Sequence, residues 1–217
     1  MVTSFLHQIA SYPVIYDWIQ RLAGHEVIDE HMRRSLDRVV TQEQLSILDV
    51  GGGTGKGRRL WSSQSSYICL DNDPVKLSPL VRNPAQGSGL LADATRMPLG
   101  SGVFDVVVCC LVSHHISDLR FPFLLAECMR VLKKTGVFLF VDPVWDSTRP
   151  VGRLLWRYDR GSYPRRVAQL DSNLSQCGSI LHREEFTTLH RFVLYLITKN
   201  PASNVENLLV DHNAIHS

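Results

Sequence analysis

One stretch, Ile47 to Lys56, constrains the fold of this chain more than any other. It opens with the apolar run Ile-Leu-Asp-Val and continues as Gly-Gly-Gly-Thr-Gly-Lys. A short apolar run that ends at glycine is typical of a buried parallel strand followed by a tight turn. Glycine lacks Cβ, so Gly51, Gly53 and Gly55 can take a positive φ and let a ligand lie against the backbone. The residues that follow, 58–61, are predicted to open a helix whose free N–H groups point back at that ligand.

The spacing of the glycines separates three kinds of nucleotide loop. A dinucleotide fingerprint requires G-x-G-x-x-G. Its third glycine would stand at Lys56 if the count starts at Gly51, and at Arg58 if it starts at Gly53. A P-loop ends in Gly-Lys-Ser/Thr, whereas here Gly57 follows the lysine. What remains is an acidic residue followed by alternate glycines, at Asp49, Gly51, Gly53 and Gly55.

This pattern resembles that of the class I S-adenosylmethionine-dependent methyltransferases, in particular the small-molecule group that includes the ubiquinone and menaquinone C-methyltransferases. The resemblance covers roughly residues 46 to 141, with the motifs in the family's order. It implies that S-adenosyl-L-methionine is the cofactor, S-adenosyl-L-homocysteine the product, and an O-, C- or N-atom of a metabolite or lipid the acceptor. A non-catalytic module that binds the same cofactor or a partner is the alternative, because fold does not fix function.

The order of elements predicts the architecture. Apolar strands alternate with amphipathic helices from residue 46 onward, and two strands end the pattern at 180–189 and 192–198. We expect an α/β, doubly wound, mostly parallel seven-stranded sheet with helices on both faces, in one structural domain. Residues 1–45 form a helical lid segment with a helix from His31 to Val40, residues 46–200 the methyltransferase domain, and residues 201–217 a polar tail.

The resemblance assigns cofactor roles to residues at the ends of successive strands. Asp71 lies about 20 residues past the first glycine, where a carboxylate accepts hydrogen bonds from a ribose diol. Asp73 better suits the N-cap of a helix that begins at Pro74. Asp93 is expected at the adenine amine. The predicted cofactor-binding residues are Asp49, Gly51, Gly52, Gly53, Gly55, Asp71, Asn72, Asp93, Ala94, Cys110, Leu111 and, from the lid, Tyr16.

Two histidines, His114 and His115, follow the long apolar strand at residues 103–111. Histidine titrates near neutrality, so either side chain is a candidate catalytic base. In many relatives one of these histidines only packs or caps, and a base is needed only if the acceptor must lose a proton. The Asn/Asp-Pro-Pro-aromatic signature of amino-directed enzymes on nucleic acids and protein glutamine is absent after this strand.

An insertion at about residues 144–176 is rich in arginine and aromatic residues. In the resembled fold such a segment commonly forms part of the acceptor pocket, and its guanidinium groups would hold an anionic acceptor. A solvated helix face is the favoured alternative for these arginines, and an anionic lipid surface is a third. The predicted substrate-binding residues are Trp145, Arg149, Trp156, Arg157 and Arg160.

Composition excludes several classes. A net charge of +2 over 217 residues does not favour nucleic acid as a partner. No stretch has the length of a membrane span or the pattern of a secretory signal, so we expect a cytoplasmic protein. We expect it to be a monomer or a homodimer. The five cysteines form no C-x-x-C pair, which predicts neither disulfides nor a metal site.

Overall fold

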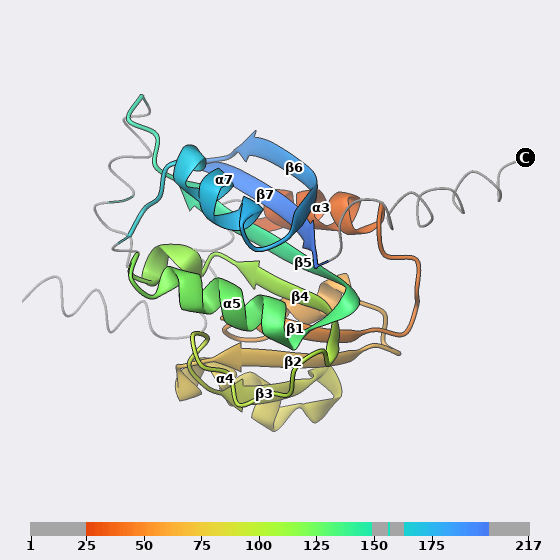
Figure 1. Ribbon diagram of the computed structural model, residues 1–217. Coiled ribbons are helices and arrows are strands. Elements are labelled where there is room, and N and C mark those ends of the chain that lie inside the picture. Colours follow the sequence, from red (N-terminus) through yellow and green to blue (C-terminus); the bar gives the residue numbers. More distant parts are fainter. Residues whose placement is uncertain (1–24, 149–155, 157–162, 200–217) are drawn as a thin grey trace, which may run out of the picture.

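The computed structural model describes residues 25–148, residue 156 and residues 163–199. The predicted lid up to residue 24, including Tyr16, and the predicted tail at 201–217 lie outside the described residues. Within them, a single sheet forms the middle layer of the molecule, with helices on either side (Figure 1). This is the doubly wound α/β arrangement that the sequence predicts.

The sheet has seven strands in the order β3-β2-β1-β4-β5-β7-β6. The first five are parallel to one another, whereas β7 runs antiparallel between β5 and β6. The predicted number of strands and the antiparallel pair at one edge are therefore confirmed. The strands are β1 (Ser46–Val50), β2 (Ser66–Asp71), β3 (Ser88–Leu91), β4 (Phe104–Cys110), β5 (Leu132–Val144), β6 (Ser179–Thr187) and β7 (Arg191–Thr198).

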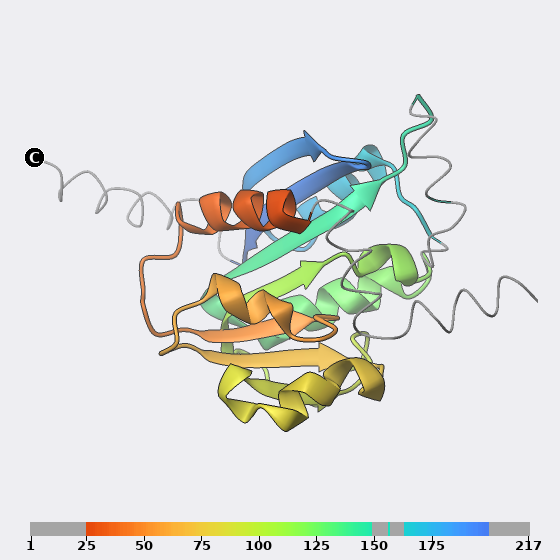
Figure 2. The same cartoon turned by 180° about the vertical axis from the view of Figure 1, so that it is seen from behind.

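Among the residues that the structure describes in full elements, two α-helices cover each face of the sheet. Helices α5 (Phe121–Val131) and α7 (Val167–Ser175) lie in front of the sheet in Figure 1. Helices α3 (His25–Leu36) and α4 (Pro74–Arg82) lie on the other face, which Figure 2 shows. Three short 3₁₀ helices complete the described elements: η1 (Lys56–Leu60), η2 (Pro84–Gln86) and η3 (Ser113–His115).

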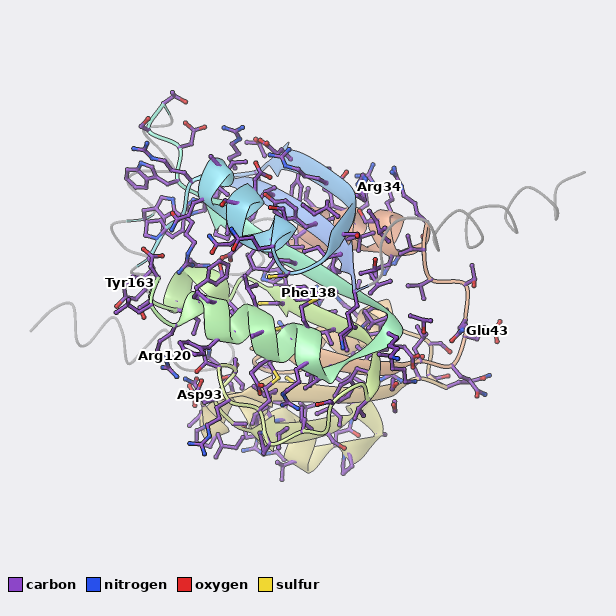
Figure 3. The ribbon with its side chains drawn as sticks, viewed as in Figure 1. Arg34, Glu43, Asp93, Arg120, Phe138 and Tyr163 are labelled. Atoms are coloured by element: carbon purple, nitrogen blue, oxygen red, sulfur yellow. The ribbon has the colours of Figure 1, made fainter. Side chains whose placement is uncertain are left out.

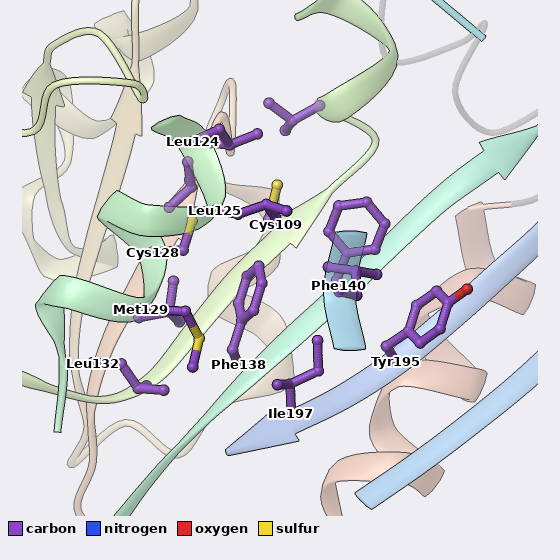
Figure 4. Close-up of a cluster of buried hydrophobic side chains, with 14 of the residues drawn as sticks. Cys109, Leu124, Leu125, Cys128, Met129, Leu132, Phe138, Phe140, Tyr195 and Ile197 are labelled. Carbon is purple, nitrogen blue, oxygen red and sulfur yellow. The ribbon is translucent and has the colours of Figure 1, made fainter. Parts of the chain in front are cut away.

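Alternation along the strands divides the core in two. In β1, Leu48 packs toward α5 and Ile47 toward α3 and α4, because successive side chains of a strand point to opposite faces. The α5 side contains a cluster of aromatic side chains from β5 and β7, among them Phe138, Phe140 and Tyr195 (Figure 4). Both faces of the central strands are therefore buried, which explains their near-continuous apolar sequence.

Several element boundaries differ from the predictions. The helix expected from His31 to Val40 spans His25–Leu36 instead, with Ile28, Met32 and Leu36 on its buried side. The predicted α-helix after the glycine loop is the 3₁₀ turn η1. The sequence predicts a third strand over residues 90–94, whereas β3 ends at Leu91, so Asp93 lies in the loop beyond it. The Asp73 side chain accepts from the N–H of Val75, as predicted for the N-cap of α4.

None of the helices in residues 25–148 and 163–199 has both the length and the apolar character that a membrane crossing requires.

Candidate cofactor and catalytic site

The glycine loop between β1 and η1 has the backbone that its sequence requires. Gly51, Gly53 and Gly55 all have positive φ, at 68°, 59° and 76°. A Cβ at Gly51 would lie 2.5 Å from Val112, and one at Gly55 would lie 2.8 Å from Leu80. At Gly53 the nearest atom would be 3.8 Å away. The loop therefore closes against its neighbours at its two ends and leaves open space in the middle, where a ligand can approach the backbone.

Asp71, at the end of β2, is tied to this loop. Its carboxylate accepts hydrogen bonds from the N–H of Gly53 at 3.0 Å and from that of Asp73 at 2.9 Å, and only 4% of the residue is exposed. A carboxylate offers about four acceptor positions, so two hydrogen bonds leave room for a diol. The following Asn72 is exposed. Asp71 thus shapes the loop in addition to the ribose role predicted for it.

Asp49 lies beneath the loop. It is buried and accepts a hydrogen bond from the Tyr67 hydroxyl. A Cβ at Gly52 or Gly57 would collide with the Asp49 side chain, which explains the extra glycines. Burial raises the pKa of Asp49 to about 6, against a partial lowering by the Tyr67 hydrogen bond. A negative charge at this position is therefore costly until a cation approaches it.

The two predicted adenine residues follow β3. Asp93 is largely exposed, and one of its oxygens accepts hydrogen bonds from both the N–H and the hydroxyl of Thr95. Its other oxygen pairs with Arg120, and Figure 3 shows the two residues close together at the carboxyl ends of the strands. The backbone bond from Thr95 is the largest factor that lowers the pKa of Asp93. Ala94 is half-buried beside it.

A cavity of about 70 Å³ opens beside the glycine loop, lined by residues along it from Gly51 to Gly57. The predicted residues Cys110 and Leu111 line it, and Leu111 has a φ of 61°, a conformation that stores strain in a residue other than glycine. Helix α3 contributes Asp29, whose carboxylate binds the guanidinium of Arg59 from η1. Neither of these two residues was predicted. They stand 30 positions apart, and no local pattern links them.

His114 and His115 differ sharply in environment. His114 is 5% exposed, and its Nδ1 lies 2.7 Å from the carboxylate of Asp142, at the end of β5. The backbone N–H of His114 and the Ser113 hydroxyl also donate to Asp142, which is 1% exposed. A carboxylate only accepts, so Nδ1 of His114 carries a proton and donates it in this hydrogen bond. His115 is exposed, with its ring 4.1 Å from that of His114.

Arg165 departs from the solvated arginine face that the sequence favoured, whereas the neighbouring Arg166 is exposed. Arg165 is 2% exposed and donates to the carbonyl oxygens of Ser113 and Ile116, each at 2.7 Å. It also pairs with Asp118 at 2.9 Å and lies 4.0 Å from the centre of the Phe121 ring. Burial lowers its pKa, which the neighbouring carboxylates partly offset. This arginine holds the loop after β4 in place and was not among the predicted site residues.

Part of the predicted substrate site can be located. Trp156 is buried, and its ring meets that of His114 edge-on at 5.7 Å. Trp145 is half-buried, and its N–H donates to the carbonyl of Arg165. Arg149, Arg157 and Arg160 lie outside the described residues. Among the residues that the structure describes, no three histidine, cysteine or acidic side chains gather as a metal site would require.

The fold and the loop define a class. An open, mostly parallel sheet with a glycine loop after its first strand binds a nucleotide-like cofactor across the carboxyl ends of the strands. The profile of a family described as a methyltransferase domain matches residues 48–140.

Known relatives agree with this match. A Synechocystis protein described as an uncharacterized methyltransferase is 28% identical over 88% of this chain and 91% of its own. A demethylmenaquinone methyltransferase of Thermotoga maritima is 23% identical over 62% of this chain and 59% of its own. A phosphoethanolamine N-methyltransferase of Haemonchus contortus, solved with S-adenosylhomocysteine, has a TM-score of 0.61 at 15% identity, over 79% of this chain and 53% of that one.

The chain is a class I S-adenosylmethionine-dependent methyltransferase. The residues present fit this cofactor, because open space beside Gly53 adjoins the carboxylate of Asp71, and because the buried acid Asp49 borders the cavity beside the loop.

Proposed function

We propose that this methyltransferase methylates a small cytoplasmic molecule at an oxygen or carbon atom whose proton must be removed. The observation that carries this proposal is the buried pair of His114 and Asp142, because it fixes the tautomer of a histidine at the carboxyl end of β4. A hydroxyl or carbon acid needs a base when it attacks, whereas an unprotonated amine does not.

The cofactor supplies a methyl group on a sulfonium centre, whose departing thioether is neutral and needs no acid. The protein's contribution is then alignment and the exclusion of water. In this proposal Gly51 to Gly55 and the backbone at Cys110 and Leu111 face the methionine part. Asp71 with Asn72 faces the ribose, and Asp93 with Ala94 the adenine. His114 takes the proton of the acceptor, and His115 lines the entrance.

The acceptor would lie against Trp156, whose ring covers His114. The arginines that precede and follow this tryptophan in the sequence favour an acceptor that carries an anionic group. The demethylmenaquinone methyltransferase relative supports a lipid-like alternative. In both cases the acceptor is a small molecule, and neither nucleic acid nor protein is required.

Calorimetric titration with S-adenosylhomocysteine tests the cofactor assignments. We expect Asp71→Asn to weaken binding at least tenfold, because the amide replaces one acceptor oxygen by a donor. Asp73→Asn is the matched control and should remain within twofold of wild type, since asparagine also caps helices. Equal affinities for wild type and Asp71→Asn would refute the ribose assignment.

A transfer assay tests the acceptor class. Labelled S-adenosylmethionine is offered with hydroxylated, carbon-acid and amine acceptors, with and without anionic groups. We expect turnover only with the first two classes, and a loss of about a hundredfold in His114→Ala. Turnover with amines that survives His114→Ala would contradict the proposal.

A further inference from the structure

The cavity beside the glycine loop has an unusual set of charges. Two acids, Asp29 and Asp49, line it together with three basic side chains, Lys56, Arg59 and His25. The rest of the lining comes mainly from backbone and apolar groups, such as Gly52, Leu60 and Leu111. Acidic and basic side chains around one cavity match a zwitterion better than they match either a phosphate or a simple cation.

The two basic side chains and the two acids come from different elements. Lys56 and Arg59 belong to η1, directly after the glycine loop. Asp29 belongs to α3, which packs on the same face of the sheet, and Asp49 to β1. Both η1 and α3 contribute side chains to the lining of this cavity, and both elements lie on the face of the sheet that Figure 2 shows.

Arg59 is held in place but retains unused donors. Its Nε lies 2.7 Å from Oδ2 of Asp29, and one terminal nitrogen, Nη2, donates to the same oxygen. Among the described residues, no acceptor hydrogen-bonds the other terminal nitrogen, Nη1. The side chain of Arg59 is 45% exposed and that of Asp29 18% exposed. The pair therefore presents a fixed guanidinium at the mouth of the cavity, with donors left for a ligand.

We propose that Arg59 binds the α-carboxylate of the amino-acid end of the cofactor, and that Asp29 positions its guanidinium for this contact. The inference rests on the methyltransferase assignment and adds a residue that determines specificity for the whole cofactor over truncated adenosyl compounds. Asp49, whose negative charge is buried beneath the same cavity, lies on the side of the cofactor's ammonium group.

The test compares two ligands that differ in one group. S-Adenosylhomocysteine carries the carboxylate, whereas S-adenosyl-3-thiopropylamine keeps the amine and lacks only the carboxylate. Calorimetry is carried out with wild type, Arg59→Gln, Arg59→Lys and Arg34→Gln. Arg34 is the control, because it lies on α3 in an exposed pair with Glu30 and does not line the cavity, so its change removes one positive charge of the same kind.

We expect Arg59→Gln to weaken S-adenosylhomocysteine about tenfold and to leave the affinity for the amine within twofold. Arg59→Lys should restore part of the loss, and Arg34→Gln should bind both ligands like wild type. Equal weakening of both ligands by Arg59→Gln would show that Arg59 acts only through the fold, and an unchanged affinity for S-adenosylhomocysteine would show that the carboxylate binds elsewhere. Either outcome overturns the proposal. Neither ligand requires an acceptor, so the result is independent of the proposed methylation reaction.

Discussion

At the scale of a single residue, the buried carboxylate of Asp49 lowers the stability of the folded protein and would favour the binding of a cation. Its pKa is raised to about 6 from 3.8, chiefly because burial removes water from the carboxylate. A shift of this size corresponds to roughly 3 kcal/mol at neutral pH. The folded protein carries this cost whenever Asp49 is ionised, and a bound ammonium group would offset it. Functional sites commonly hold such unfavourable groups.

The sign of this effect gives a prediction for Asp49→Asn. A raised folded-state pKa means that the contribution of Asp49 is present below pH 3.8 and is lost as the pH rises to about 6. Asparagine accepts the hydrogen bond of Tyr67 without a charge. We therefore expect Asp49→Asn to unfold with a free energy about 1–3 kcal/mol higher than wild type at pH 7, and with a smaller difference at pH 4.

Urea denaturation at both pH values measures this difference. A variant that is less stable than wild type at pH 7 would show that the ionised carboxylate stabilises the folded state. Tyr67→Phe serves as the comparison for the loss of the hydrogen bond, and it should raise the pKa of Asp49 further, because the Tyr67 hydroxyl lowers that pKa.

Single residues also show what the sequence could and could not predict. The glycines were predictable, because positive φ and close approach leave a local signature. Arg165 was not, because its partners are backbone carbonyls about 50 positions earlier. An arginine-rich sequence does not distinguish a guanidinium group that faces water from one that binds a buried loop. The contact between His114 and Asp142 could not be predicted either, because only the pairing of strands in the sheet brings the ends of β4 and β5 together.

At the scale of elements, α3 is attached to the far edge of the sheet. His31 donates to Glu184 of β6 at 2.8 Å and stacks on Phe186 at 3.9 Å between ring centres. Burial alone would raise the pKa of Glu184, but the hydrogen bond from His31, with support from His182, lowers it overall. Since α3 also forms a wall of the cavity beside the glycine loop, this contact links the β6 edge to that cavity.

We predict that Glu184→Gln lowers the free energy of unfolding by about 1 kcal/mol at pH 7. A lowered pKa means that the stabilisation is present above the ordinary value of 4.5 and disappears as the pH falls through the folded-state value. The difference between variant and wild type should therefore shrink in acid. Thermal unfolding at pH 7 and pH 4 measures it, with Glu30→Gln on the exposed side of α3 as control. A constant difference at both pH values would contradict the ionic contribution.

The elements themselves were largely predictable from apolar periodicity, but their ends were not. Residues 25–30 contain polar side chains on the exposed side of α3, so the sequence alone favoured a later start at His31. In the first turn of α3 the buried side chain is Ile28, and it packs in a cluster with residues of β-strands far along the chain. Tertiary packing, which a local window does not contain, sets such a boundary.

At the scale of the whole molecule, the two cores share one sheet and should unfold together. Phe138 is fully buried in the α5-side cluster, on a strand whose neighbouring residues pack on the other face. We predict that Phe138→Ala lowers the free energy of unfolding by about 3–5 kcal/mol. Tryptophan fluorescence and far-ultraviolet circular dichroism should report one common transition.

Phe123→Ala is the control for this prediction, because Phe123 lies on α5 but is 62% exposed. Its loss should change stability by less than about 0.5 kcal/mol. Two separate transitions in Phe138→Ala would show that the halves of the sheet fold as independent units.

The placement of β7 has a consequence for how the chain is made. β7 is the last strand among the described residues, yet it lies between β5 and β6 and covers the long β5 edge. During synthesis the ribosome delivers residues 132–144 well before residues 191–198, so β5 leaves the exit tunnel with one row of backbone N–H and C=O groups unpaired. The nascent chain must protect that edge, and completion of the sheet waits for β7.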